Sequence, residues 1–206
     1  MALVKADSQT IQPSPQTSRR DLPALLADLA AADPTVRRAA VRDLADYPQA
    51  AMDLCDLLEQ EANSSVRAVL FSTLITLHSP AVAGRLAAHL RSDDVALRNG
   101  AIEALQEMPD AVAPHLQQLL SDADSDVRIF AVNILAVLRH LRAPEWLAAV
   151  IRSDTHVNVC AAAIDGLAEV GRPEALNDLA DLRRRFAGNA FMEFAIDAAM
   201  SRIRGE

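Results

Sequence analysis

The chain has 206 residues and a formal net charge of −8. This acidic balance argues against wholesale binding of nucleic acid, which requires a dense basic surface to displace counterions. Aromatic residues make up 3% of the chain and glycine occurs six times, while alanine and leucine dominate. The composition therefore predicts an almost entirely helical protein.

The first twenty residues differ from the rest in composition. Residues 1–20 carry Pro13 and Pro15 among many serine, threonine and glutamine residues, which predicts a disordered N-terminal arm. This stretch has no apolar core of signal-peptide length, and no run of 18 apolar residues occurs in the chain. We therefore expect a soluble, cytoplasmic protein that does not bind membranes.

From residue 21 onward, two kinds of apolar segment alternate six times. In the first kind, leucine and alanine recur three and four residues apart, the helical interval. These segments span residues 23–31, 50–60, 81–91, 111–120, 144–152 and 174–185. The second kind repeats the pattern VRRAAVRDL and spans residues 36–44, 66–74, 97–105, 127–135, 159–167 and 191–199.

The second residue of each VRRAAVRDL copy recurs every 30 to 32 residues, at Arg37, Arg67, Arg98, Arg128, Cys160 and Met192. A fixed period of this size indicates stacked supersecondary units. Each unit is predicted to hold a helix A, a short polar turn and a helix B. One domain, residues 21–206, then contains six units, at about 22–49, 50–80, 81–110, 111–143, 144–173 and 174–206.

Helix B has a single apolar stripe when it is placed on a helical wheel. In the third unit this stripe consists of Leu97, Ala101, Ile102 and Leu105. The residue equivalent to Ala101 is alanine in five of the six units, which allows neighbouring helices to approach closely. Because no unit can bury this stripe alone, the units are predicted to stack into an all-α solenoid.

A polar row accompanies the repeat. Four residues before each arginine stands a residue suited to a helix N-cap or a turn, and these are Asp33, Asn63, Asp94 and Asp124. Each of Arg37, Arg67, Arg98 and Arg128 is predicted to pair with the turn acid of its own or the next unit. The interpretation is a structural ladder along one edge, with an anion site as the alternative. The row ends in the last two units, where His156 and Gly188 replace the acid.

The pattern D-x-x-V-R-x-x-A-(V/I)-x-x-L with a period near 31 resembles the HEAT-repeat family, and its short arginine-containing form resembles the PBS-lyase HEAT-like subtype. This resemblance covers residues 21 to about 204. It implies a right-handed α-solenoid whose B helices line a concave inner surface. It also implies a scaffold or adaptor that grips other proteins, in some bacterial cases beside chemosensory or two-component signalling proteins. The alternative is a phycobilin-lyase-like or chaperone-like subunit that acts on a cofactor protein.

The search for chemistry finds no catalytic signature. The sequence has no phosphate-binding loop, no nucleophile elbow and no H-E-x-x-H motif, and no histidine is followed by glutamate. Cys55 and Cys160 are interpreted as small buried apolar residues. Residues 183–185, three arginines, are interpreted as a solvated helix end, or alternatively as a docking patch for an acidic partner. We expect no enzyme activity, no cofactor and no metal.

The face of helix B opposite the apolar stripe is the predicted partner surface. Its residues are Arg42, Val69, Ser72, Glu103, Glu107, Ile129, Phe130, Asn133, Val137, Asp165, Glu169 and Asp197. Apolar Ile129, Phe130 and Val137 beside acidic neighbours are typical of an interaction patch with a polar rim. We expect a protein or peptide partner with basic and apolar side chains. Two alternatives remain: Phe130 and its equivalents pack against the adjacent helix B, or the chain uses this face to form a homo-oligomer.

Overall fold

The computed structural model describes residues 20–138 and 140–206. In this part of the chain all regular structure is helical, with twelve α-helices and three short 3₁₀ helices. The first six α-helices are α1 (Leu22–Asp28), α2 (Pro34–Asp43), α3 (Ala51–Gln60), α4 (Ser64–Leu77), α5 (Pro80–Ala88) and α6 (Val95–Gln106). The others are α7 (Pro109–Leu120), α8 (Ser125–Val137), α9 (Ala143–Ser153), α10 (Val157–Val170), α11 (Ala175–Arg185) and α12 (Ala190–Arg204). The 3₁₀ helices are η1 (Leu44–Asp46), η2 (Pro48–Ala50) and η3 (His89–Arg91).

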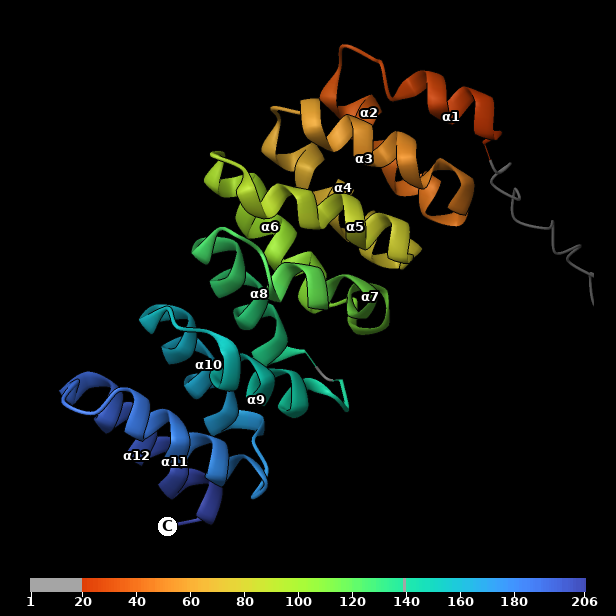
Figure 1. Cartoon of the computed structure of the whole chain (residues 1–206). Coiled ribbons are helices and arrows are strands. Elements are labelled where there is room, and N and C mark those ends of the chain that lie inside the picture. Colours follow the sequence, from red (N-terminus) through yellow and green to blue (C-terminus); the bar gives the residue numbers. More distant parts are fainter. Residues whose placement is uncertain (1–19, 139) are drawn as a thin grey trace, which may run out of the picture.

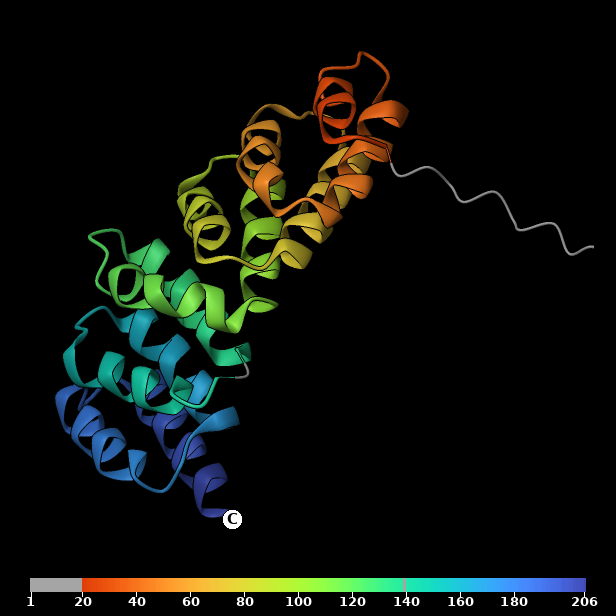
Figure 2. The same cartoon turned by 90° about the vertical axis from the view of Figure 1, so that its right-hand side faces the viewer.

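The α-helices are packed in sequential pairs that form a solenoid, with the pairs following one another in chain order (Figure 1). Each even-numbered helix packs against the even-numbered helices before and after it. Figure 2 shows that the array follows a curved path, with the even-numbered helices toward its inner side. The predicted all-α solenoid of helix pairs is therefore confirmed. Each unit range contains one pair, although helices α5, α7 and α9 begin one or two residues earlier than the ranges do.

Local sequence explains where the even-numbered helices begin. Asp33, Asn63, Asp94 and Asp124 are the N-cap residues of α2, α4, α6 and α8, and each side chain accepts a hydrogen bond from a backbone N–H of the first turn. This satisfies one of the donors that a helix start leaves unpaired. Proline residues open α2, α5 and α7, where the absent N–H costs no hydrogen bond.

The core is one continuous cluster that runs the length of the stack. The stripe predicted for the third unit is buried at Leu97, Ala101 and Leu105 and half-buried at Ile102. Beside this stripe, Gly100 allows close packing between units, since the ring of Phe71 lies where a Cβ on Gly100 would stand. Burial of apolar side chains from water contributes about 25 cal/mol per Å², so this interface between units stabilises the array.

The last helix pair departs from the predicted register. Helix α12 begins after the N-cap Asn189, whose side chain accepts a hydrogen bond from the Met192 backbone N–H. Gly188, predicted to occupy this turn position, lies one residue earlier and has a φ of 86°. As a result, Met192 takes the buried place at the helix start and Phe191 is left 62% exposed.

The beginning of the folded part needs a correction at one residue. Arg20 was predicted to belong to the disordered arm, but its guanidinium donates hydrogen bonds to Asp28 and Asp43, and its carbonyl accepts one from the Tyr47 hydroxyl. Arg20 therefore belongs to the first unit. The rest of the predicted arm, residues 1–19, lies outside the described residues.

Candidate functional site

The arginine row of the repeat joins each unit both to its own turn and to the next unit. Arg37 donates hydrogen bonds from Nη1 to the carbonyls of Ala31 and Ala32, at 2.8 and 3.0 Å. Equivalent bonds run from Arg67, Arg98 and Arg128 to the carbonyl six residues earlier, at Glu61, Ser92 and Asp122 respectively. These carbonyls lie in the turns that follow the odd-numbered helices, so each guanidinium ties the second helix of its unit to its own inter-helix turn.

The carboxylates that these arginines meet differ from the predicted ones. Arg37 binds both oxygens of Glu61, at 2.7 and 2.9 Å, instead of Asp33 or Asn63. Arg67 binds Asp94 of the next unit at 2.6 Å, which matches the predicted ladder.

Arg98 has no carboxylate partner among the described residues, and its Nε is buried without an acceptor. The equivalent acid, Asp122, is instead paired with Arg91. Asp124 makes no ion pair with the arginine row and acts as a helix cap. Of the four predicted turn residues, only Asp94 pairs with a row arginine. At Arg37 and Arg128 the residue that follows the next odd-numbered helix, Glu61 or Asp154, binds the guanidinium instead.

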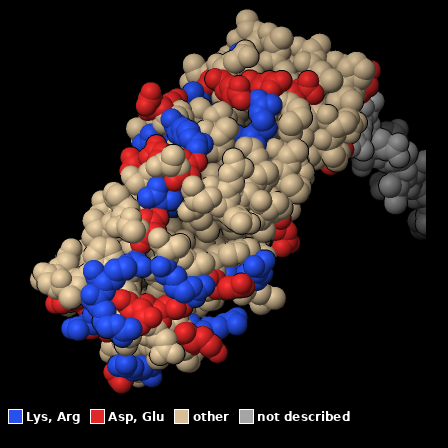
Figure 3. Space-filling model, viewed as in Figure 1, with Lys and Arg blue, Asp and Glu red and all other residues tan. Residues whose placement is uncertain are grey.

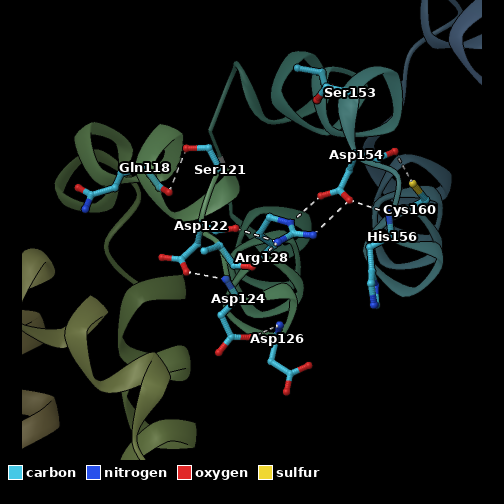
Figure 4. Close-up of polar contacts among 12 residues, drawn as sticks. Gln118, Ser121, Asp122, Asp124, Asp126, Arg128, Ser153, Asp154, His156 and Cys160 are labelled. Carbon is cyan, nitrogen blue, oxygen red and sulfur yellow. Dashed lines mark hydrogen bonds and ion pairs between the residues drawn. The ribbon is translucent and has the colours of Figure 1, made fainter.

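Figure 4 shows the rung at Arg128. The guanidinium lies between the carbonyl of Asp122 in its own unit and the Asp154 carboxylate of the next, which it binds at 2.7 and 3.4 Å. Asp154 also accepts a hydrogen bond from the His156 backbone N–H at 2.8 Å. Burial by itself raises the pKa of Asp154, but the hydrogen bonds from Arg128 and His156 outweigh it, so the pKa lies below its ordinary value.

The fifth unit replaces the row arginine by Cys160, and another residue supplies the missing guanidinium. Arg185, at the end of α11, donates hydrogen bonds of 2.7 to 2.9 Å to the carbonyls of Ile151, Arg152 and Asp154. Cys160 Sγ lies 3.7 Å from this guanidinium and donates to the Asp154 carbonyl at 3.3 Å. Residues 183–185 are thus engaged within the chain, since Arg183 and Arg184 also form ion pairs, with Asp197 and Asp181.

The odd-numbered helices carry further ion pairs between units. Arg85 of α5 pairs with Asp56 and Glu59 of α3, and Arg152 of α9 pairs with Asp178 of α11. On the face shown in Figure 3, acidic and basic residues accordingly alternate along one side of the array, next to a broad uncharged region. Exposed pairs contribute only about 0–1 kcal/mol each, so we assign them to the register of the stack.

Two grooves lie over the even-numbered helices, on the face opposite the core. The first groove, between α4 and α6, has a volume of about 870 Å³. Its lining includes Phe71, Ile75, Ser72, Glu103 and Glu107. The second groove, over α8, α10 and α12, has a volume of about 720 Å³. Its lining includes Asn133, Val137, Asp165, Glu169, Phe191 and Phe194. Gln106 lies in both linings, and its Nε2 donates to the Asn133 carbonyl at 3.5 Å, so the grooves meet there.

The structure brings seven of the twelve predicted surface residues into these grooves. Ser72, Glu103 and Glu107 line the first groove, and Asn133, Val137, Asp165 and Glu169 line the second; all seven are exposed. Glu103, Glu107, Asn133 and Asp165 have no side-chain hydrogen-bond or ion-pair partner in the part of the chain that the structure describes, whereas Glu169 pairs with Arg202.

The other five predicted surface residues lie elsewhere. Val69, Ile129 and Phe130 are half-buried and pack against the core, and the Arg98 guanidinium lies over the Phe130 ring. Arg42 is exposed on α2 outside both grooves. Asp197 faces the end of the stack, where it binds Arg183. Val69, Ile129 and Phe130 stand at the margin of the predicted face, and for Phe130 the structure matches the alternative that it packs against the adjacent even-numbered helix.

Two aromatic residues of the second groove are absent from the predicted partner surface. Phe191 and Phe194 are 62% and 75% exposed, and they stand three residues apart on one face of α12. Counted from the N-cap, they correspond to Asp126 and Ile129 of the fourth unit, so the late start of α12 points them outward. The signal that reveals this is Asn189, a strong N-cap residue one position after the expected turn.

Within the described ranges, no helix is long and apolar enough to cross a bilayer. The same residues contain no group of three or more histidine, cysteine or acidic side chains placed to hold a metal ion.

Comparison with known proteins places these observations in a family. No curated protein matches the sequence. Similar solved structures include human deoxyhypusine hydroxylase in complex with glycerol, 20% identical over 89% of this chain and 74% of that one, with a TM-score of 0.46. Another is the complex of CpcE and CpcF of phycocyanin lyase from Nostoc sp. PCC7120, 17% identical over 97% of this chain and all of that one, with a TM-score of 0.38. A third is a designed armadillo repeat protein, 16% identical over 89% of this chain and all of that one, with a TM-score of 0.39.

The family comparison covers most of the repeat domain. The family model described as HEAT repeats matches residues 22–106 and 112–186, well over half of the chain. The matched stretches include the arginine row and end before α12. The chain belongs to the HEAT-repeat family.

Proposed function

We propose that the chain is a non-enzymatic scaffold or adaptor that holds a partner protein on its concave face, in the second groove. HEAT repeats commonly bind proteins, and the sequence carries no catalytic motif. The observation that carries the proposal is the apolar lining of this groove. Phe191, Phe194 and Val137 are each more than 60% exposed and lie in one hollow.

The surroundings of these side chains support a protein-binding role. Large apolar residues gathered on a solvated surface and rimmed by polar groups mark interaction sites. Aromatic residues in a hollow serve as anchors for a partner, because they bury much area at little cost in side-chain entropy. The unpaired carboxylate of Asp165 beside them favours a partner with basic side chains.

A photo-crosslinker tests the location of the partner. We would place a photoreactive amino acid at Asn133 in the second groove, and in a control protein at Gln117, which is exposed on α7 of the other layer. We expect a crosslinked partner from Asn133, and the loss of that crosslink when Phe194→Asp is added. Equal crosslinking from both positions, or recovery unaffected by Phe194→Asp in a protein that remains folded, would refute the assignment.

We also propose that the repeats belong to the PBS-lyase HEAT-like subtype. This is supported by the period of 30 to 32 residues and by the arginine at the second position of four copies. A comparison of repeat lengths and of this arginine across related sequences would test it. A family whose typical members lack the arginine would contradict the subtype.

A further inference from the structure

The second groove is formed by side chains of three α-helices, and this limits the kind of segment that fits. The backbone groups of α8, α10 and α12 are bonded within their own helices, so they offer no sheet edge to an incoming strand. An extended segment would bring unpaired N–H and C=O groups to a largely apolar hollow. A helix satisfies its own backbone and presents one apolar side. The groove therefore favours a helical occupant.

Acidic side chains on the concave face are arranged in two pairs. Asp165 and Glu169 stand four residues apart on α10, and Glu103 of α6 stands four residues before Glu107, the C-cap residue of that helix. Residues at this spacing lie one turn apart on the same face of a helix. All four are exposed and line a groove. Glu169 pairs with Arg202, which also lines the second groove, so Asp165 supplies the unpaired charge on α10. An occupant that crosses both helices therefore meets unpaired carboxylates at two separate places.

The helix between these pairs is neutral at the equivalent positions. Helix α8 packs between α6 and α10 and carries Asn133 and Val137 there. Beyond α10, the apolar wall of Phe191 and Phe194 continues the surface. Across the stack, the order is acidic, neutral with an exposed valine, acidic, and then aromatic.

The distance between the two acidic pairs sets the spacing that basic residues on a partner helix need, and we call this required spacing the ruler. Packed helices lie about 8–10 Å apart, so two steps from α6 to α10 span about 16–20 Å. A partner helix that rises 1.5 Å per residue covers this distance in about 11–13 residues. Eleven residues are close to three full turns, so two side chains at this interval point to the same side.

We propose that the concave surface recognises an amphipathic helix that carries two basic residues about eleven positions apart. One basic side chain meets the α6 pair and the other meets the α10 pair, while apolar side chains between and beyond them contact Val137 and the Phe191–Phe194 wall. This inference rests on the proposed function and adds to it the charge pattern of the partner.

The probes are three synthetic helical peptides with the same leucine face. The first has two lysines eleven residues apart on that face, the second has them seven residues apart, and the third has glutamines in their place. Binding is measured by fluorescence anisotropy at low and high salt. We expect the first peptide to bind about fivefold more tightly than the second, as two partly solvated ion pairs would give, and to lose this advantage at high salt.

Matched charge variants test the ruler on the protein side. The double variant Glu103→Gln/Asp165→Asn removes one acid from each pair, and we expect it to abolish the preference for eleven-residue spacing. The control Asp53→Asn/Asp110→Asn removes two exposed acids from the odd-numbered helices α3 and α7, with the same change in net charge. It should leave the preference unchanged.

The outcomes separate this inference from the proposed function. Peptide binding that Phe194→Asp abolishes but that ignores lysine spacing would overturn the ruler and leave the groove as a docking site. An equal effect of the two double variants would also overturn the ruler. Failure of all three peptides to bind, with no partner crosslinked at Asn133, would overturn both.

Discussion

Replacing Glu61 with glutamine tests whether the row of guanidinium groups stabilises the stack. The Glu61 side chain is 3% exposed and binds Arg37 through two hydrogen bonds, while its Oε1 also accepts the Asn63 backbone N–H. Breaking a buried ion pair costs about 3–5 kcal/mol. Arg37 is partly solvated and keeps its bonds to two carbonyls, and glutamine retains an acceptor, so we expect a loss of about 2 kcal/mol in the free energy of unfolding.

The pH dependence of this loss gives a second measurement. The hydrogen bond from Arg37 holds the pKa of Glu61 below its ordinary value. A carboxylate with a lowered folded-state pKa contributes stability that is present above its unfolded pKa, about 4.3, and is lost as the pH falls through the folded value. The difference between wild type and Glu61→Gln should therefore be full at pH 7 and shrink below about pH 4.

The assay is urea unfolding followed by far-ultraviolet circular dichroism at pH 7 and at pH 3. The matched control is Glu59→Gln, two residues earlier in α3, where the side chain is 46% exposed and pairs with Arg85. Exposed pairs are worth only about 0–1 kcal/mol. Equal losses for the two variants, or a Glu61→Gln loss that stays constant down to pH 3, would refute the reasoning.

Three further predictions follow from burial and hydrogen bonding. Leu105→Ala should lower the free energy of unfolding by about 2–5 kcal/mol in urea titrations, because it opens a cavity in the core; a loss under 1 kcal/mol would contradict the packing. Cys55 and Cys160 are buried, and burial raises the pKa of the Cys55 thiol to about 11. A thiol reagent at pH 7.5 should therefore modify both cysteines only in urea. Rapid modification of the native protein would contradict this prediction. Arg185→Gln should cost about 1–2 kcal/mol because it uncaps α9, while the control Arg184→Gln should have little effect, and equal effects would exclude the capping role.

The regular part of the fold was predictable because it repeats. Period, helix type and buried stripe follow from spacing alone, so the stack and the burial of Leu97, Ala101 and Leu105 are confirmed. Four turn residues act as caps because a short polar side chain before an apolar helix has few other roles. These features depend on local sequence or on contact with an identical neighbour.

The polar contacts were less predictable because several partners compete for each guanidinium. Arg37 binds Glu61, which lies 24 residues later, and not Asp33, which lies four residues earlier. Asp122 is paired with Arg91 and not with Arg98. An acid six residues before the next row position is the partner at Glu61 and Asp154, but the equivalent Asp122 is paired with a second arginine, Arg91.

The groove residues of α12 were misplaced for a different reason. The degenerate last copy of the motif hides a one-residue displacement, which places Met192 instead of Phe191 at the buried start of α12. A motif comparison aligns residue types, whereas the cap determines the rotation of the helix.

The capping of α9 by Arg185 constrains how the array can change in length. In the first four units the row arginine binds a carbonyl in the turn of its own hairpin, so those hairpins supply this contact themselves. In the fifth hairpin the equivalent guanidinium comes from Arg185 of the sixth hairpin. Loss of the sixth hairpin would therefore leave the last carbonyls of α9 without these donors, so the fifth hairpin cannot end the array without exposing them.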